Sequence, residues 1–381
     1  MKMNVFTTAQ SAEWMEALKK CSHDFYHGPQ YHAVAERSGE GKALLFHYSE
    51  GEYSIALPLL IRSLDGIPGV RPGTHWRDAT SVYGYAGPVA SHAAVPEPVL
   101  RNFQERLREY LLDIKIVTVF SRLHPVIPQH SLLAGLGECR TLSQTVSIDL
   151  TLPLERQRAA YRSSLKTALN KLRRNCVTCV HDPEGVHLDA FIEIYHETMR
   201  RVDAAPMYFF PREYFDKLFQ TLGDRFHLAF CLSEGKIVCG GIFIECGDVL
   251  QYHLGGTPNG ALEFAPMKLL LDEMRIWASG RNLKVFHLGG GATAQADDPL
   301  LHFKLGFSDR VHDFAAWRWV LDSAAHEKLC QERLLWLEAN GISEANPAFF
   351  PQYRTPVTRP ALLSPHLSTM SRVTPAQVLH P

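Results

Sequence analysis

The most constraining feature of this sequence is a pattern of elements that occurs twice in the same order. Residues 43–57 consist of two hydrophobic runs joined at a Ser-Glu-Gly turn, and residues 226–244 consist of two such runs joined by the same three letters. Runs of β-branched and aromatic residues on either side of a short glycine-containing loop predict a β-hairpin. We therefore expect one hairpin of this kind in each half of the chain.

The segments that follow the two hairpins also match in order. They are a tyrosine- and glycine-rich strand at 82–88 and 250–256, a helical segment at 97–112 and 263–279, and a short apolar strand at 114–120 and 284–288. This four-element match favours duplication of one unit, giving an α+β fold with mixed sheets. The alternative is a single α+β domain whose halves are alike by chance.

Length and composition agree with two folded halves. A chain of 381 residues exceeds the roughly 100–200 residues of an ordinary domain. With 46% hydrophobic and 21% charged residues, it has ample material for a core. The 39 basic and 40 acidic residues give a net charge of −1, so the whole molecule has no long-range attraction for DNA or anionic membranes. Any site for a polyanion must be local.

Several classes of protein are excluded by the lack of their signals. No window has the roughly 18–20 consecutive apolar residues of a membrane span, and the first residues lack a secretory signal. Eight scattered cysteines are typical of reduced thiols rather than a disulfide framework. The Cys176 and Cys179 pair has no second pair to complete a metal site, and we expect no metal. These observations predict a cytoplasmic location.

Between the halves, residues 154–175 predict one amphipathic helix. An apolar face repeats at three- and four-residue spacing and consists of Tyr161, Leu165, Ala168, Leu169 and Leu172. The remaining surface has seven cations against the single acid Glu155; these are Arg156, Arg158, Arg162, Lys166, Lys171, Arg173 and Arg174. This basic surface is a candidate binding site for phosphate or a polyanion, and the alternative is an ordinary solvated helix face.

The carboxy-terminal part differs in composition from the rest. A helical segment at 324–340 stops at Gly341, which is a plausible left-handed cap. Seven prolines follow between residues 347 and 381. A proline-rich tail cannot maintain a helix, so we expect extended or partly disordered structure without a catalytic role.

An ordered set of motifs in the second half resembles a known family. The motifs are the basic segment 161–168, the helix end Thr198-Met199-Arg200-Arg201, residues 252–256, residues 288–291 and residues 303–307. This set is similar to that of the FemAB-like proteins, whose carboxy-terminal half is an acetyltransferase-like domain found in many polysaccharide and cell-envelope gene products. The resemblance is specific over about 145–319. It is looser over 1–144, where residues 81–88 are the best landmark.

The resemblance implies two tandem GNAT-like acyltransferase domains. We expect them at 1–144 and 145–322, followed by a carboxy-terminal helix at 323–341 and a proline-rich extension at 342–381. The implied activity is N-acyl transfer from a carrier, with acyl-CoA as co-substrate and no tightly bound cofactor. The implied acceptor is an amine of a nucleotide sugar, a polysaccharide or a cell-envelope precursor.

Two alternatives remain beside this interpretation. One is a peptidoglycan-bridge aminoacyltransferase that takes its group from aminoacyl-tRNA; such relatives often have a long helical hairpin, and no charged heptad insert of that kind occurs here. The acyl-CoA interpretation also lacks a motif, because the loop 255–261 has no basic residue. The other alternative is a non-catalytic module that binds a nucleotide or RNA through the basic surface.

Three residues are candidates for catalysis. Lys304 lies between Phe303 and Phe307 at helical spacing and matches the lysine that the resemblance places near the reacting ester, where it would stabilise developing negative charge or a donor phosphate. The alternative is an ordinary surface lysine whose stem packs on aromatic rings. His253 could accept the proton of the amine, although a buried, hydrogen-bonded core histidine is the more common outcome. Glu263 is expected to open a helix and is a further candidate base.

Other residues are candidates for binding. Arg162 and Lys166, together with Gly290 in the Gly289–Gly291 run, could hold the phosphates of a carrier. Arg201 at the matched helix end and Tyr252, which should face away from His253, are assigned to the same site. Tyr83 and Tyr85, two positions apart, are candidates either for lining a cleft between the halves or for the core.

Overall fold

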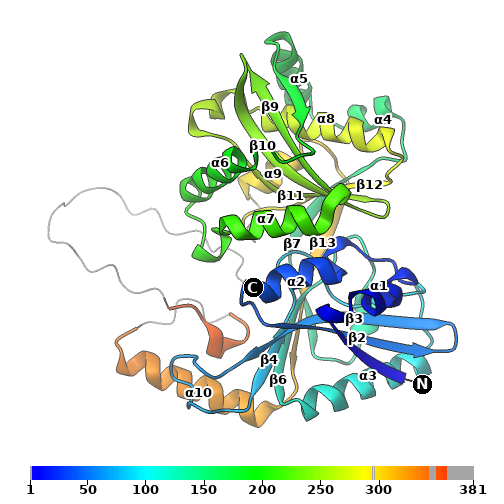
Figure 1. The fold of residues 1–381 in the computed structure, drawn as a ribbon, viewed down its shortest axis with the longest axis vertical. Coiled ribbons are helices and arrows are strands. Elements are labelled where there is room, and N and C mark those ends of the chain that lie inside the picture. The colour runs from blue at the N-terminus through cyan, green and yellow to red at the C-terminus, as the bar shows by residue number, and fades with distance from the viewer. Residues whose placement is uncertain (1, 294, 296, 343–348, 358–381) are drawn as a thin grey trace. The chain divides into compact units, whose positions relative to one another are not determined.

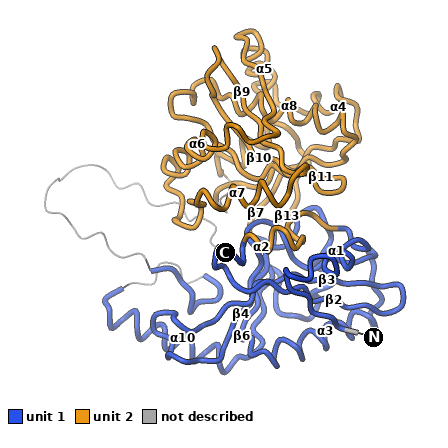
Figure 2. Tube along the Cα trace, in the orientation of Figure 1, with its two compact units in different colours: residues 1–22, 35–141, 315–381 blue, residues 23–34, 142–314 orange. Residues whose placement is uncertain are grey.

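The computed structural model describes residues 2–293, 295, 297–342 and 349–357. Figure 2 shows that the chain divides into two compact units. Unit 1 comprises Met1–Ser22, Ala35–Thr141 and Ala315–Pro381, and unit 2 comprises His23–Val34 and Leu142–Phe314. The chain therefore passes from one unit to the other four times, and each unit is described by itself below.

Unit 1 is built on a mixed sheet with the strand order β1-β2-β3-β4-β6-β13 (Figure 1). The strands are β1 (Lys2–Thr7), β2 (Lys42–Glu50), β3 (Tyr53–Ser63), β4 (Arg77–Thr80), β6 (Ile116–Arg122) and β13 (Val311–Val320), with the short β5 (Val89–Ala90) beside β3. Among the described strand pairs of this unit, β4 and β6 run parallel and the others are antiparallel.

Helices on unit 1 bury apolar faces against this sheet. They are α1 (Ser11–Lys19), α3 (Glu97–Asp113) and α10 (Ser323–Ala339), whereas α2 (Pro29–Arg37) lies mostly in the part of the chain that belongs to unit 2. The buried face of α3 has the helical spacing Val99, Phe103, Leu107 and Leu111. A second core lies under α10, where Ala325 and Leu329 join Val117 of β6 and the buried Tyr353.

The strands of unit 2 have the order β7-β12-β11-β10-β9-β8. The strands are β7 (Glu138–Asp149), β8 (Thr178–His181), β9 (Phe226–Ser233), β10 (Lys236–Cys246), β11 (Val249–Gly256) and β12 (Val285–Gly290). The helices are α4 (Leu154–Ala159), α5 (Ser163–Arg174), α6 (Leu188–Arg201), α7 (Arg212–Leu222), α8 (Met267–Gly280) and α9 (Pro299–Lys304). Among the described strand pairs of this unit, β11 and β12 run parallel and the others are antiparallel.

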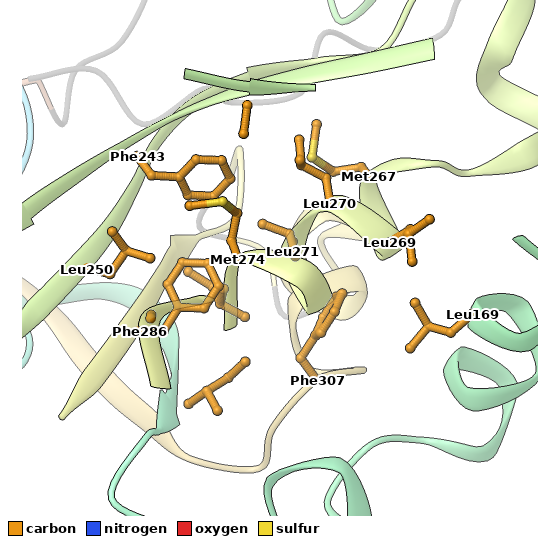
Figure 3. Packing of buried hydrophobic residues seen from close by; sticks show 14 of the residues in the cluster. Leu169, Phe243, Leu250, Met267, Leu269, Leu270, Leu271, Met274, Phe286 and Phe307 are labelled. Carbon is orange, nitrogen blue, oxygen red and sulfur yellow. The ribbon is translucent and has the colours of Figure 1, made fainter. Parts of the chain in front are cut away.

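The core of unit 2 lies between its sheet and the helices α5 and α8. Figure 3 shows Phe243, Leu250 and Phe286 from the strands facing Leu270 and Met274 of α8. On the other side of the sheet, α6 contacts β10 and β11, and α7 contacts β9. Because β10, β11 and β12 lie inside the sheet, their positions relative to one another are held by helices on both faces.

The order of elements in the two units confirms the predicted duplication and the α+β fold. In each unit a hairpin, β2–β3 or β9–β10, is followed by a strand antiparallel to its second arm. A crossover helix, α3 or α8, then leads to a strand that runs parallel to the preceding one. The hairpin glycines Gly51 and Gly235 both have positive φ, as the Ser-Glu-Gly turns predict.

Three predicted elements differ from the structure. The strand expected at 82–88 is instead β4 (Arg77–Thr80), and the later segment forms bends because Gly84 and Gly87 have positive φ. The single helix expected at 154–175 is two helices, since Arg162 is extended and interrupts them. The helix expected from residue 263 begins only at Met267, after the left-handed Ala265 and Pro266.

The division of the chain also differs in detail from the expected domains at 1–144, 145–322, 323–341 and 342–381. The first boundary falls between Thr141 and Leu142, and the segment 23–34 belongs to unit 2. Residues 315–322 belong to unit 1 because β13 pairs with β6 there, and α10 packs in the same unit.

Part of the proline-rich extension is ordered on unit 1. Residues 349–357 are described, and the buried Tyr353 hydroxyl lies 2.7 Å from the Thr118 hydroxyl of β6. The expectation of an extended or partly disordered tail is therefore wrong for this segment. The rest of that expectation, at 343–348 and 358–381, lies outside the described residues. Among the described helices, none is long and apolar enough to cross a membrane.

Candidate functional site

The site begins with a gap between two parallel strands. β11 and β12 pair at Val249 with Val285, at Leu250 with Phe286 and at Gln251 with His287, and their pairing ends there. Both strands then continue, β11 beside β10 as far as Gly256 and β12 beside β7 as far as Gly290. Two strand edges that face each other without pairing leave backbone polar groups for a ligand. Ligands of open α/β sheets bind at the carboxyl ends of such strands.

Lys304 lies where these strands diverge. Its Nζ donates a hydrogen bond of 2.5 Å to the carbonyl oxygen of Gly290, the last residue of β12. The same ammonium lies 5.7 Å from the ring centre of Tyr252, the first β11 residue beyond the paired stretch. Only 6% of Lys304 is exposed. The side chain at the end of α9 thus places an amino group between the diverging ends of both strands.

Burial gives this amino group an unusual charge state. It lowers the pKa of Lys304 to about 7, and the carboxylate of Asp298 opposes the shift. In the described part of the chain, no ion pair involves Lys304. A desolvated ammonium without a carboxylate partner interacts strongly with any negative charge that forms beside it.

The buried charge of Lys304 should also make the unfolding free energy depend on pH. At pH 6 Lys304 is protonated in both the folded and the unfolded chain, so the cost of burying the charge is fully present. As pH rises from 7 toward 10.5, only the unfolded chain keeps the proton, and this cost disappears. We expect Lys304→Met to raise the unfolding free energy by roughly 1–4 kcal/mol at pH 6. Urea unfolding at pH 6 and pH 10 checks this: the gain should shrink at pH 10, and an equal gain at both would contradict it.

Asp298 organises the loop that leads to Lys304. Its Oδ1 accepts from the N–H of Leu301, and its Oδ2 accepts from the N–H groups of Ala292 and Thr293. Burial alone would raise the pKa of Asp298, but these hydrogen bonds outweigh it and hold the pKa below its usual value. A Cβ on Gly291 would lie 2.4 Å from Asp298 Oδ1, so only glycine fits there. The carboxylate therefore caps α9 and fixes the glycine run beside it.

Tyr252 and His253 have separate surroundings. The hydroxyl of Tyr252 lies 3.6 Å from the Met267 sulfur, and burial raises the pKa of the phenol, which stays protonated. His253 is the extra residue of a β-bulge, and its ring nitrogens contact the hydroxyls of Tyr214 at 2.9 Å and Tyr26 at 3.4 Å. Burial lowers the pKa of His253 to about 3. This is the environment of a core histidine, the alternative that the sequence analysis gave beside the role of a base. Of these two residues, Tyr252 is the one that lies beside Lys304.

Gly255 is needed for the position of Tyr252. A Cβ at this glycine would lie 2.0 Å from the Tyr252 hydroxyl, far closer than any real contact. We expect Gly255→Ala to displace the Tyr252 ring and to lower the rate of the N-acyl transfer that the resemblance implies by about 10-fold. Gly247→Ala tests for general disturbance at a loop glycine and should change this rate little. A donor-saturated kcat measurement checks this. Unchanged turnover in Gly255→Ala would contradict the placement.

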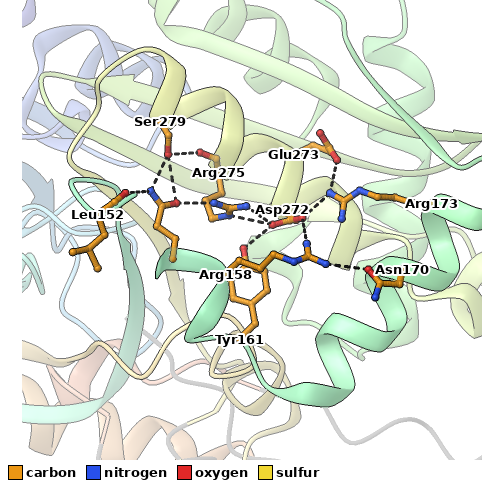
Figure 4. A network of polar contacts seen from close by, with 10 residues as sticks. Leu152, Arg158, Tyr161, Asn170, Arg173, Asp272, Glu273, Arg275 and Ser279 are labelled. Atoms are coloured by element: carbon orange, nitrogen blue, oxygen red, sulfur yellow. Dashed lines mark hydrogen bonds and ion pairs between the residues drawn. The ribbon is translucent and has the colours of Figure 1, made fainter. Parts of the chain in front are cut away.

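The predicted basic surface is partly a structural network. Figure 4 shows Asp272 of α8 bound by Arg173 at 2.7 Å and by Arg158 at 3.4 Å, with the Tyr161 hydroxyl at 2.8 Å. Arg275 completes the group at 2.9 Å. Two of the seven cations therefore hold α4 and α5 against α8. Arg156, Lys171 and Arg174 are exposed.

The structure brings Arg162 next to the helix of Lys304. Its Nη1 lies 2.7 Å from His302 Nε2 on α9, and its backbone N–H donates to the carbonyl of Gly306. Lys166 instead donates to the carbonyl of Ala159 at 2.9 Å, where it caps α4.

Arg201 lies at the far end of β11. It donates to the carbonyl of Thr257 at 3.0 Å and to Asn259 Oδ1 at 2.8 Å, and so ties the end of α6 to the loop after the strand. Glu263 is exposed on a short 3₁₀ turn, and the prediction that it opens a helix is wrong. Among the described residues no hydrogen bond joins Glu263 to Lys304.

Tyr83 and Tyr85 belong to unit 1 and lie on bends rather than on a strand. The guanidinium of Arg122 lies 5.7 Å from the Tyr83 ring, and Tyr85 contacts the His124 ring edge-on. In the CxxC pair, Cys176 is exposed, and Cys179 lies 2.8 Å from the sulfur of Cys231 on the neighbouring strand. Within the described ranges no cluster of three or more His, Cys, Asp or Glu side chains is placed to bind a metal.

Two important residues were missed from the sequence. Asp298 had a readable signal, because aspartate directly before proline is typical of a helix cap with proline at the first position. Asp272 had none, since an aspartate between apolar helix residues gives no indication of the three arginines that come to it from other turns and helices.

Comparisons with known proteins fit this geometry. Residues 159–304 match the family model described as an acetyltransferase (GNAT) domain, a range that runs from the last residue of α4 to Lys304. A UDP-N-acetylmuramoylpentapeptide-lysine N(6)-alanyltransferase of Weissella viridescens is 27% identical over 145 residues, which are 38% of this chain and 42% of that protein. The chain thus spans less than half the length of this curated relative.

Solved structures show the same fold over most of the chain. The crystal structure of FemX superposes with a TM-score of 0.67 at 12% identity and covers 86% of this chain and 99% of FemX. A DUF2156 domain of a putative lysylphosphatidylglycerol synthetase from Agrobacterium fabrum gives a TM-score of 0.50 at 14% identity, covering 87% and 98%. The domain model shows that residues 159–304 are similar to GNAT acetyltransferase domains, and the fold shared with FemX extends over most of the chain.

Proposed function

We propose that this protein transfers an acyl group, most simply an aminoacyl group, from a carrier to an amine, and that unit 2 performs the reaction. The observation that supports the proposal is the buried amino group of Lys304, held between the diverging ends of β11 and β12. This position lies within the part of the chain that resembles GNAT domains.

The reaction needs alignment and charge stabilisation rather than an enzyme nucleophile. The neutral amine of the acceptor attacks the carbonyl carbon of the donor ester or thioester, and a tetrahedral oxyanion forms. The bond to the carrier then breaks, the carrier leaves with the electron pair, and the amine nitrogen loses a proton to solvent or to the leaving group. Protonated Lys304 would stabilise the oxyanion, and unpaired N–H groups of the strand edges would assist.

The aminoacyl donor is preferred because of the relative and the charge near the site. The Weissella protein is named as an alanyltransferase that acts on the lysine of a peptidoglycan precursor. Arg162 on α5 contacts α9, and the exposed Arg156, Lys171 and Arg174 extend the positive surface on α4 and α5. Such a surface suits a polyanionic carrier such as tRNA. We therefore propose aminoacyl-tRNA as donor, an amine of a cell-envelope precursor as acceptor, and the cytoplasm as the location where both occur.

A second candidate is acyl transfer from acyl-CoA to a nucleotide sugar. The description of the matched domain as an acetyltransferase favours it. The same Lys304 geometry would serve a thioester as well as an ester, so donor specificity must come from the carrier-binding surface.

The test offers both donors to the full chain. Radiolabelled alanyl-tRNA and acetyl-CoA are each incubated with UDP-N-acetylmuramoylpentapeptide and with a UDP-amino sugar, with and without ribonuclease treatment of the donor. The proposal predicts that label enters the amide of the peptide precursor from alanyl-tRNA and that ribonuclease abolishes this transfer. Transfer only from acetyl-CoA would reassign the donor. Lack of transfer from either donor to either acceptor would overturn the proposal.

A further inference from the structure

Unit 1 contains a cavity that is not part of the site in unit 2. Its volume is about 600 Å³. The walls come from the end of β3 and the loop after it, from Thr80 and Phe120 of the parallel strands, from Arg333 of α10 and from the ordered tail segment 349–357. All these segments belong to unit 1.

Arg333 is the unusual group in this cavity. Only 4% of the residue is exposed, and its two terminal nitrogens donate to the carbonyls of Pro68 at 2.6 Å and Thr355 at 2.9 Å. Its Nε–H is buried and has no acceptor among the described residues. In the described ranges no ion pair gives Arg333 a carboxylate, and its guanidinium lies 4.9 Å from the ring centre of Trp336. This ring contact offsets only part of the free-energy cost of a buried guanidinium that has an unused donor and no counter-charge.

Two further arginines keep the cavity positive. Arg62 and Arg354 both bind the fully buried Asp78, with Arg62 Nε at 2.9 Å and Arg354 Nη2 at 3.0 Å from its Oδ1. The described residues that line the cavity include three arginines and one acid, Asp65, which is exposed and accepts from the N–H of Gly73.

The remaining walls suit an organic group. Phe120, Phe349, Phe350 and Tyr353 provide aromatic surface. Tyr353 is fully buried and hydrogen-bonded to Thr118, so this part of the tail has a fixed position on the sheet. The cavity therefore combines a cation that has no carboxylate partner with apolar walls.

We propose that this cavity binds a small organic anion, with its carboxylate or phosphate group on the Nε of Arg333 and its body against the aromatic walls. The ligand would complete the charge balance of unit 1 and link the tail segment 349–357 to α10. The site is separate from the acyl-transfer reaction, and its failure would leave the proposed function unaffected.

The experiment measures thermal unfolding and calorimetric binding of the full chain with three probes, pyrophosphate, inorganic phosphate and citrate, against potassium chloride at matched ionic strength. We expect at least one probe to raise Tm in a saturable way. A response to pyrophosphate or phosphate indicates a phosphate ligand, and a response to citrate indicates a carboxylate ligand. Arg333→Met should weaken that binding at least 10-fold. Arg101→Met on α3, an exposed arginine paired with Glu97, should leave it unchanged.

A second variant protects the test against a folding defect. Ile67 lines the cavity, and Ile67→Trp would fill it without removing a charge. This variant should also weaken binding at least 10-fold. The proposal is overturned if none of the three probes shifts Tm beyond the chloride control, or if a saturable shift persists in both Arg333→Met and Ile67→Trp.

Discussion

Replacing Lys304 with alanine should lower kcat for amide formation by about 10²–10³-fold, the usual effect of removing one group that stabilises an oxyanion. The KM values for donor and acceptor should change much less, because the ammonium acts mainly on charge that develops in the transition state. Steady-state kinetics with the donor identified by the two-donor experiment measures this.

A matched control is available in the same unit. Lys284 is 61% exposed and pairs with Asp248 on the surface, so Lys284→Ala should retain full turnover. The pH profile adds a second readout. With a pKa of about 7, Lys304 loses its charge above neutrality, so kcat should have a falling limb near pH 7 that Lys304→Ala lacks. Turnover of Lys304→Ala within threefold of the parent would remove this residue from the mechanism.

Replacing Asp272 with alanine should destabilise unit 2 by about 3–5 kcal/mol, the range for removing one partner of a buried ion pair. Asp272 is fully buried, and Arg275 beside it is only 2% exposed. Without the carboxylate, Arg275 keeps Gln157 as acceptor but loses its counter-charge. The contacts of Arg158 and Arg173 that hold α4 and α5 to α8 are lost as well.

Glu273 provides the control for this prediction. It is the next residue on α8, is 36% exposed and binds only Arg173 among the described ion pairs, so Glu273→Ala should cost less than about 1 kcal/mol. Hydrogen exchange of peptides from α4, α5 and α8, together with urea unfolding, measures both variants. Equal protection in the two variants would contradict the structural role of Asp272.

The pH dependence of stability should record the same network. Burial alone would raise the pKa of Asp272, but hydrogen bonds from Arg173, Tyr161 and Arg275 hold it below its usual value. A carboxylate with a lowered folded pKa stabilises the protein above its unfolded pKa, and this stability is lost as pH falls through the folded value. Unit 2 should therefore weaken below about pH 4, and Asp272→Ala should show a smaller acid dependence.

The duplicated fold could be predicted because its signals are local. A hairpin depends on two runs of strand-forming residues and a glycine turn between them. In each half of the chain these residues are close together in the sequence, around Gly51 in the first half and Gly235 in the second. The order of hairpin, strand, helix and strand then follows from periodicity along the chain. Each of these features is decided by residues close in sequence, which a sequence displays directly.

The exchanges between the units could not be predicted, because they depend on distant pairing. β13 joins unit 1 through its pairing with β6, almost 200 positions earlier in the chain. The strand β4 was missed because Asp78 looks like a surface residue, and its burial is possible only with Arg62 and Arg354 on either side. The break at Arg162 likewise depends on Gly306 and His302, which accept its backbone and side-chain hydrogen bonds.

The candidate site was predictable to a similar extent. Lys304 stood out through its aromatic neighbours and its match to a motif, and the structure places it between two strand ends. The surroundings that decide the role of His253 come from Tyr26 and Tyr214, far away in sequence. The gap between β11 and β12 depends on where the pairing of these two strands ends, and this cannot be seen in the sequence of either strand.

The most direct test of the central claim is a crystal structure of the full chain with a stable amide analogue of aminoacylated adenosine. The account predicts the analogue between β11 and β12, with its carbonyl oxygen within about 3 Å of Lys304 Nζ. Density for the analogue elsewhere, with Lys304 still bonded to Gly290 and no ligand atom near it, would contradict the claim that this lysine is the centre of acyl transfer.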